Sequence, residues 1–201
     1  MSIRGYFSRY LIDTLWKSAV DDVKTVGTTE AVKLTSTLSQ RGGIKIYNTD
    51  DTNFIRVAFS GDNVDNGIKI AAGESIELPI GEDLDIYAIA DTADVDVYVL
   101  EYTVTIGNYP LKVWNAVNEA VISDVADSAT KITTTSLSYR EKVLVANIGS
   151  NPVLIGVSTD NVANSAISIA ADEYVIFPAM VGLDLYAYSS AGTSLYVVEI
   201  E

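Results

Sequence analysis

Cysteine and histidine are both absent from the 201-residue chain. Without cysteine, the chain forms no disulfide, no thiolate nucleophile and no zinc–sulfur site of its own. Without histidine, it lacks the commonest general base and the commonest transition-metal ligand. A Ser-His-Asp triad, a Cys-His pair and an HExxH zinc site are therefore excluded. We expect a protein that is not an enzyme and that holds no metal or other cofactor.

Long apolar runs and phosphate-binding glycine loops are missing as well. No apolar run approaches the roughly 20 residues that span a bilayer, so we expect no membrane span. The first residues carry charges at positions 4, 9 and 13 and lack the uninterrupted apolar core of a signal peptide. No GxxxxGK[ST] motif is present, so a phosphate loop of that kind is excluded.

Basic residues are scarce, with 13 Lys and Arg against 27 Asp and Glu and a net charge of −14. None lies between Lys69 and Lys112, and none follows Lys142. A surface this acidic repels phosphate, so we expect no nucleic-acid partner. The excess charge indicates solubility rather than an acidic docking role. Residues 1–24 differ, because their basic residues outnumber their acidic ones.

An internal repeat covers nearly the whole sequence. Trp16 and Lys33 are separated by the same 17 positions as Trp114 and Lys131. The offset between the copies stays at 98 or 99 from there to YVLE (98–101) and YVVE (196–199). The chain is therefore an internal duplication, with a boundary near residues 103–108.

Each copy contains seven short segments that alternate apolar and polar residues, which predicts β-strands. Segments rich in Asn, Asp and Gly lie between them and favour turns. We predict an all-β fold of two tandem antiparallel β-sandwich (jelly-roll-like) modules with a short N-terminal helix. The predicted units are a partly helical leader (1–30), copy 1 (31–102), an interdomain leader (103–129) and copy 2 (130–201). The alternation predicts burial of Ile44, Ile46, Val57 and Leu84 in copy 1 and of Val143, Val145, Ile155 and Leu183 in copy 2.

The two leaders carry equivalent tryptophans, Trp16 and Trp114. Apolar residues recur at helical spacing from Ile3 to Ala19, which predicts a helix in the first leader. The second leader has Pro110 as a possible helix start, but alternation from Val113 onward also fits an extended segment. Each tryptophan either closes the core of its own module or forms an exposed aromatic anchor for a partner.

Residues 1–12 have no full counterpart before Trp114, so the shared fold does not require them. Aromatic residues and arginine are enriched at interface hot spots. Candidate docking residues are therefore Tyr6, Phe7, Arg9, Tyr10, Trp16 and Trp114. The alternative is that the first leader packs on the first sandwich or on a symmetry mate.

Three sets of polar side chains invite functional readings. Paired carboxylates hydrolyse glycosides in some enzymes, and such a pair lies within one site. Here each acid appears once per copy in the same local context, so we expect these acids to be solvent-facing strand charges. The segment Asp62–Gly67 resembles a calcium loop faintly, yet position 12 is Gly73, so a polar turn is favoured. Repeated tyrosines either stack on sugars or pack the sheets. The acids are Asp85 with Asp184, Glu74 with Glu173 and Glu101 with Glu199; the tyrosines are Tyr87, Tyr98, Tyr186 and Tyr196.

The second copy resembles the small β-sandwich modules of tailed-bacteriophage virion accessory proteins. The resemblance rests on REKVLVANIGSNPVLIGVSTDNV, ISIAADEYVIFP and LDLYAYSSAGTSLYVVE, and the first copy carries the same frame. It covers about residues 31–102 and 130–201. Such modules occur in capsid decoration proteins, head fibres and tail-associated proteins. The pattern has no catalytic signature, so no site residues transfer with it.

The resemblance implies a structural virion protein, a capsid decoration or head-fibre component that binds the particle surface. The implied partners are other virion proteins (capsid, portal or tail) and further copies of the chain in a homo-oligomer. The implied location is the virion, assembled in the host cytoplasm. The alternative is a receptor- or carbohydrate-binding module of a phage tail or cell surface.

Overall fold

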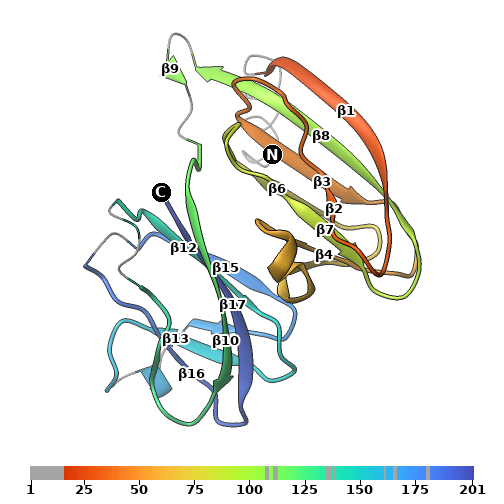
Figure 1. Ribbon diagram of the computed structural model, residues 1–201. Coiled ribbons are helices and arrows are strands. Elements are labelled where there is room, and N and C mark those ends of the chain that lie inside the picture. The colour runs from red at the N-terminus through yellow and green to blue at the C-terminus, as the bar shows by residue number, and fades with distance from the viewer. Residues whose placement is uncertain are drawn as a thin grey trace, which may run out of the picture.

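The computed structural model describes residues 16–106, 109–110, 113–134, 137, 139–160, 162–164, 167–179 and 182–201. These residues form β-strands and two short 3-10 helices (Figure 1). Within them, no helix has the length and apolar character needed to cross a bilayer. The predicted all-β class is confirmed. The predicted N-terminal helix falls on residues 1–15, outside the described part, and on residues after them that form a strand.

The first module consists of two antiparallel sheets. One sheet has the strand order β1-β8-β3-β6, and the other has the order β2-β7-β4-β5. A short strand, β9, pairs antiparallel with the end of β8. The elements are β1 (Trp16–Val26), β2 (Val32–Lys33), β3 (Gly43–Asn48), β4 (Ile55–Ala58), η1 (Gly61–Asn66), β5 (Ile68–Ile70), β6 (Ser75–Leu78), β7 (Tyr87–Ala90), β8 (Val95–Ile106) and β9 (Tyr109–Pro110).

The second module repeats this arrangement with sheets β10-β17-β12-β15 and β11-β16-β13-β14. Its elements are β10 (Val117–Val125), β11 (Thr130–Lys131), β12 (Lys142–Asn147), β13 (Val153–Gly156), η2 (Val162–Asn164), β14 (Ile167–Ile169), β15 (Tyr174–Phe177), β16 (Tyr186–Tyr188) and β17 (Thr193–Ile200). If the eight sandwich strands of each module are numbered from 1 to 8 in chain order, both modules have one sheet of order 1-8-3-6 and one of order 2-7-4-5. This is the strand order of a jelly roll, so each module is one eight-stranded jelly roll.

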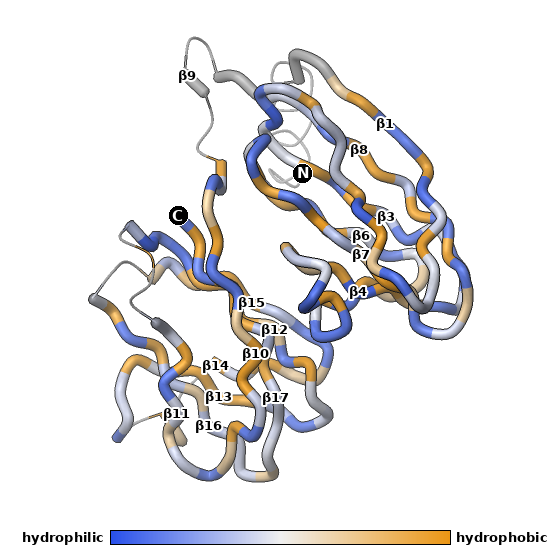
Figure 2. The backbone as a smooth tube through the Cα atoms, viewed as in Figure 1, coloured by the Kyte–Doolittle hydropathy of each residue, from blue (hydrophilic) through white to orange (hydrophobic). Residues whose placement is uncertain are grey.

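Residue alternation explains the core of the first module. Along β3, Ile44 and Ile46 are buried, whereas Lys45 and Tyr47 point to the opposite face and are exposed. The hydropathy colouring shows this alternation along β3 (Figure 2). The burial predicted from this period holds for Ile44, Ile46, Val57, Leu84, Val143, Val145 and Ile155.

The predicted burial of Leu183 is wrong, since this side chain is 41% exposed. In the first module, the segment at Trp114 pairs with residues 79–81, close to Leu84, and helps to cover that edge. No described segment covers the matching edge of the second module in this way. Leu185, two positions further along, is buried in the same way as its counterpart Ile86.

The helical prediction for the first leader is wrong from Trp16 onward. Residues 16–26 form β1 and pair antiparallel with β8 along its length. Their counterparts in the second leader form β10, which pairs with β17, so the extended alternative is the correct one there. Both strands lie at the edge of their sheet. Pairing with a long neighbouring strand therefore outweighs their weak local strand pattern.

Candidate functional site

The two modules share one hydrophobic core at the joint between them. The central strands β17 and β12 of the sheet β10-β17-β12-β15 (Figure 1) are covered on both faces, because their inward residues pack the second module and their outward residues pack on the first. The outward residues buried in the shared core are Leu144, Ala146, Tyr196, Val198 and Ile200. Burial on both faces makes these two strands the structural connection between the modules.

A hydrogen-bond cluster at Glu119 and Tyr196 orients the joint. The Tyr196 hydroxyl donates to Glu119 Oε1 at 2.9 Å and accepts the Phe59 N–H at 3.3 Å. Glu119 Oε2 accepts Ser60 Oγ–H at 2.7 Å and Asn63 Nδ2–H at 2.8 Å. Burial, together with the nearby Glu119 charge, raises the pKa of Tyr196. The donors come from the end of β4 and from η1, so the first module's loop 59–63 docks on the Tyr196 face.

Trp114 lies in the same shared core and is 4% exposed. Its backbone N–H donates to Pro79 O at 2.7 Å, and its carbonyl accepts the Gly81 N–H at 2.8 Å. Its ring lies 6.3 Å from the ring of Phe59. The indole Nε1 has no hydrogen-bond partner among the described residues, so the side chain stabilises the joint by packing.

Ion pairs at Asp172 add a charged contact between the modules. Lys69 Nζ lies 2.6 Å from Asp172 Oδ2, and Arg56 Nη2 lies 3.8 Å from Asp172 Oδ1. Gly73 occupies the position of Asp172 in the first copy, so this contact is not part of the repeated frame. Asp172 is partly exposed, and such pairs contribute little stability in water.

The predicted docking residues have different outcomes. Tyr6, Phe7, Arg9 and Tyr10 lie outside the described residues. Trp16 begins β1, and its side chain is likewise outside the description. Trp114 is buried between the modules, so it is not an exposed anchor for another protein.

A buried arginine–glutamate pair, which the sequence reasoning missed, holds each module together. In the first module, Arg41 Nη1 lies 2.5 Å from Glu101 Oε2, and both side chains are almost fully buried. Arg41 also donates to the carbonyls of Gly81 and Leu84, and Glu101 accepts the Ser36 N–H at 2.6 Å. The guanidinium fork therefore links three segments in a way that a lysine ammonium cannot.

The second module repeats this arrangement with Arg140 and Glu199, whose Nη1 and Oε2 atoms are 2.9 Å apart. Arg140 donates to the carbonyls of Ala179 at 3.0 Å and Leu183 at 2.5 Å. The prediction that Glu101 and Glu199 face solvent is therefore wrong. Each lies on the inward face of its strand, where the arginine compensates its charge.

The other repeated acids, Asp85 and Asp184, form surface ion pairs with Lys33 at 2.7 Å and Lys131 at 2.8 Å. Burial raises the pKa of Asp85, but hydrogen bonds from Lys33 and Thr35 outweigh it and lower that pKa overall. The hydrogen bond from Lys131 lowers the pKa of Asp184. These two acids sit at equivalent positions in separate modules, and their contacts indicate a structural role.

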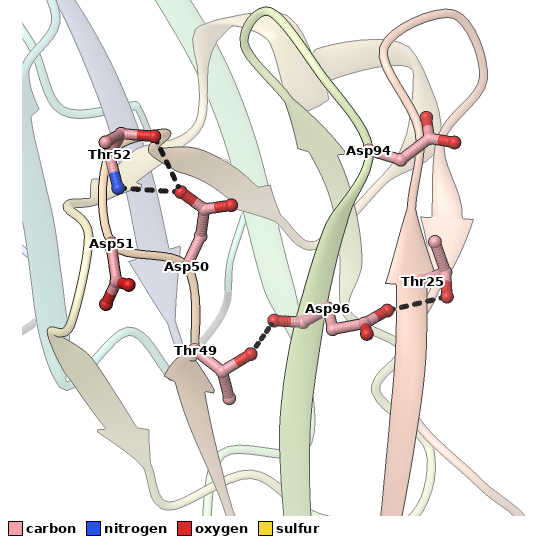
Figure 3. Close-up of a pocket in the computed structure, with 7 residues that line it drawn as sticks. All are labelled: Thr25, Thr49, Asp50, Asp51, Thr52, Asp94 and Asp96. Carbon is pink, nitrogen blue, oxygen red and sulfur yellow. Dashed lines mark hydrogen bonds between the residues drawn. The ribbon is translucent and has the colours of Figure 1, made fainter.

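An acidic hollow lies at one end of the first module (Figure 3). Its hydrogen bonds are internal: Thr25 Oγ1 donates to Asp96 Oδ1 at 2.7 Å, and Asp50 Oδ1 accepts the Thr52 N–H at 2.7 Å. No cluster of three or more potential metal ligands occurs among the described residues. The second copy has Ile148 and Gly149 near the position of Asp50, so the hollow is not repeated. Its lining residues are Thr25, Thr49, Asp50, Asp51, Thr52, Asp94 and Asp96.

The stability of the turn formed by residues 50–53 depends on the ionised carboxylate of Asp50. Hydrogen bonds from the backbone N–H groups of Asn53 and Thr52 lower the pKa of Asp50 to about 2. Because the folded pKa is depressed, the stabilisation is present above the unfolded pKa of about 3.9 and is lost as pH falls toward about 2. We expect Asp50→Asn to lower the melting temperature at pH 7 and to reduce its dependence on pH between about 4 and 2.

Thermal melts followed by circular dichroism at pH 7, 4 and 2.5 test this expectation. Asp51→Asn is the matched control, since it removes the same charge at the next position, outside the hydrogen bonds of the turn. Equal changes in the two variants would show that net charge, rather than the turn, sets the acid sensitivity.

Comparisons with known proteins yield distant structural matches. No family model matches the chain, and no curated protein does. A chain from the atomic structure of Sulfolobus Turreted Icosahedral Virus is 8% identical, with 93% of this chain and 90% of that one covered and a TM-score of 0.48. The major capsid protein P2 from Bacteriophage PM2 is 10% identical, with 90% of this chain and 96% of that one covered and a TM-score of 0.38.

HutD from Pseudomonas fluorescens SBW25 is also 10% identical, with 91% of this chain and 79% of that one covered and a TM-score of 0.33. Matches at this level do not show a common function. The jelly-roll fold rests on the strand pairings described above, and the protein is an all-β chain of two tandem jelly-roll modules.

Proposed function

We propose that the chain is a structural protein of a virus particle, a capsid decoration or head-fibre component that binds the particle surface. The observation that carries the proposal is the shared core, which joins two jelly rolls into one unit through Tyr196, Trp114 and Phe59. A spacer or decoration needs such a unit of defined geometry more than it needs a reactive site. The resemblance of both copies to phage virion modules supports the same conclusion.

The chemistry of the described side chains supports a structural role. Their most buried charges, Arg41 with Glu101 and Arg140 with Glu199, form internal ion pairs. The acids of the hollow in Figure 3 accept hydrogen bonds from their own turn and from neighbouring strands. The net charge of −14 disfavours non-specific contacts, including contacts with packaged nucleic acid.

The partners in this proposal are capsid, portal or tail proteins, and the location is the virion after assembly in the host cytoplasm. Quantitative mass spectrometry of particles purified from cells that carry the gene tests it. The chain should co-purify with the particle at a fixed ratio to the capsid protein. Absence from intact particles would contradict the proposal, and binding of the recombinant chain to host glycans would instead support the receptor-binding alternative.

Residues 1–12 provide the attachment in this proposal, because the second copy has no counterpart for Tyr6, Phe7, Arg9 and Tyr10. We expect deletion of residues 1–12 to leave the melting temperature unchanged and to remove the chain from purified particles. Copy number per particle, measured with the full-length chain as control, tests this. Full occupancy by the truncated chain would place the anchor on the described modules.

A further inference from the structure

The internal joint has two halves, and the duplication supplies each half twice. One half is the acceptor face of the second module, formed by Glu119, Val121, Tyr196 and Val198. The other half is the donor loop of the first module, residues 59–63, which bonds to that face. These two halves engage each other, and the duplication leaves a counterpart of each half in the other module.

The first module carries a matching acceptor face on β1 and β8. Asp21, Val23, Tyr98 and Leu100 occupy the positions of Glu119, Val121, Tyr196 and Val198, with the same cross-strand register. The Tyr98 hydroxyl donates to Asp21 Oδ2 at 3.3 Å, as Tyr196 does to Glu119.

This face is open to solvent, in contrast to its buried counterpart. Val23 is 59% exposed, and Tyr47, which neighbours Tyr98 on β3, is 39% exposed. Val121, the counterpart of Val23, packs against the shared core.

The second module carries a matching donor loop after β13. Val157 occupies the position of Phe59 and is 62% exposed, whereas Phe59 is buried in the joint. Ser158 occupies the position of Ser60, and in the sequence Asn161 occupies that of Asn63. The Ser158 hydroxyl accepts the Asp160 N–H at 3.2 Å, which leaves its own hydrogen able to be donated to a carboxylate.

We propose that copies of this chain associate head to tail, with the donor loop of one copy's second module on the acceptor face of the next copy's first module. In this arrangement Val157 lies over Tyr98 and Val23, and Ser158 donates to Asp21. The contact is heterologous, so repetition closes a ring or extends a fibre, depending on the rotation between the modules. This inference rests on the joint and does not depend on the proposed virion role.

The contact between copies is weaker than the internal joint. Lys45 and Tyr47 stand where Leu144 and Ala146 stand in the buried face, and a more polar interface is typical of reversible association. The internal joint also benefits from the covalent connection between its modules. Association should therefore depend on concentration. It should be measured at about 0.15 M salt or above, where repulsion between the acidic copies is screened beyond about 8 Å.

Sedimentation velocity and light scattering on the full chain test the inference. We expect the mass of the wild-type chain to rise with concentration between about 10 μM and 1 mM, the range of weak interfaces. Val157→Glu blocks the donor loop and Val23→Glu blocks the acceptor face, so each variant alone should remain monomeric. Each still has one intact half, so an equimolar mixture should form a one-to-one dimer that grows no further.

Tyr139→Glu is the matched control because it adds the same charge at another exposed apolar position, where the side chain is 74% exposed. It should associate as the wild type does, and all three variants should keep the wild-type melting temperature. The inference is wrong if the wild type is monomeric at about 1 mM. It is equally wrong if either valine variant still self-associates, which would indicate a symmetric contact elsewhere, or if the mixture forms no dimer.

Discussion

Replacement of Glu101 with alanine is expected to lower the free energy of unfolding by about 3–5 kcal/mol. The change leaves the Arg41 guanidinium, whose side chain is fully buried, without its carboxylate. It also removes the acceptor of the Ser36 N–H. A domain is typically stable by about 5–15 kcal/mol, so the loss is a large part of the total.

The size of this loss depends on the remaining bonds of Arg41. Its guanidinium is held in place by the carbonyls of Gly81 and Leu84, so it cannot turn toward water when the carboxylate is removed. Replacement of both partners by apolar residues would not restore full stability either, because these carbonyls would lose their donors. Glu199→Ala should destabilise the second module in the same way through Arg140.

Asp85→Ala is the matched control for Glu101→Ala, as it removes the acid of an ion pair in the same module. Asp85 and Lys33 are both partly exposed, and such surface pairs contribute about 1 kcal/mol or less. Urea unfolding followed by circular dichroism measures both variants. If the two losses were equal, the Arg41–Glu101 pair would not be buried as described.

Period-two alternation made much of the fold predictable. Copies 1 and 2 show it in most of their short strands, and the structure confirms the two jelly rolls. The joint was also visible in the sequence as a difference between the copies. GIKIYN (43–48) alternates, whereas KVLVAN (142–147) is apolar at nearly every position. A strand that is apolar on both faces is covered on both faces, and the structure buries nearly all of KVLVAN.

The edge strands could not be predicted in the same way. β1 is polar on much of both faces, since Asp21 and Asp22 follow each other along an exposed edge. At the centre of β10, apolar residues point to both faces, because Val121 faces the joint and Ile122 its own core. Neither strand therefore keeps, along its whole length, the alternation that identifies a half-buried strand; in the second leader only the stretch from Val113 to Val117 indicated an extended segment.

The buried ion pairs were missed because a charged residue in a strand usually faces solvent. Glu101 and Glu199 nevertheless stand at inward positions of alternating strands, and Arg41 and Arg140 recur with them in both copies. That joint recurrence was the available signal. The sequence could not indicate that the arginines reach the glutamates, because the chain separates the partners by about 60 residues.

Tyr196→Ala is expected to lower the free energy of unfolding by about 3–5 kcal/mol, the usual effect of truncating a fully buried aromatic side chain. Tyr196 is completely buried, although its counterpart Tyr98 on the first module is only half-buried. The substitution leaves a cavity in the shared core and removes the hydroxyl that bonds to Glu119 and to the Phe59 N–H. Glu119 keeps Ser60 and Asn63 as donors, so most of the loss comes from packing.

Two further variants separate the contributions to this loss. Tyr98→Ala removes the same side chain from the exposed face of the first module and should cost about 1 kcal/mol or less. Tyr196→Phe keeps the ring and removes only the hydroxyl, so it should cost about 1–3 kcal/mol through the unpaired Phe59 N–H and the lost bond to Glu119. Packing should therefore account for the difference between Tyr196→Ala and Tyr196→Phe.

Urea unfolding measures the losses, and tryptophan fluorescence locates them. Trp114 lies in the shared core beside Phe59, so opening of the joint should move its emission to longer wavelength before the modules unfold. Tyr196→Ala should bring this shift to lower urea concentration, whereas Tyr98→Ala should leave it in place. If Tyr98→Ala and Tyr196→Ala had equal effects, the two faces would be equally buried, and the modules would not meet through the Tyr196 face.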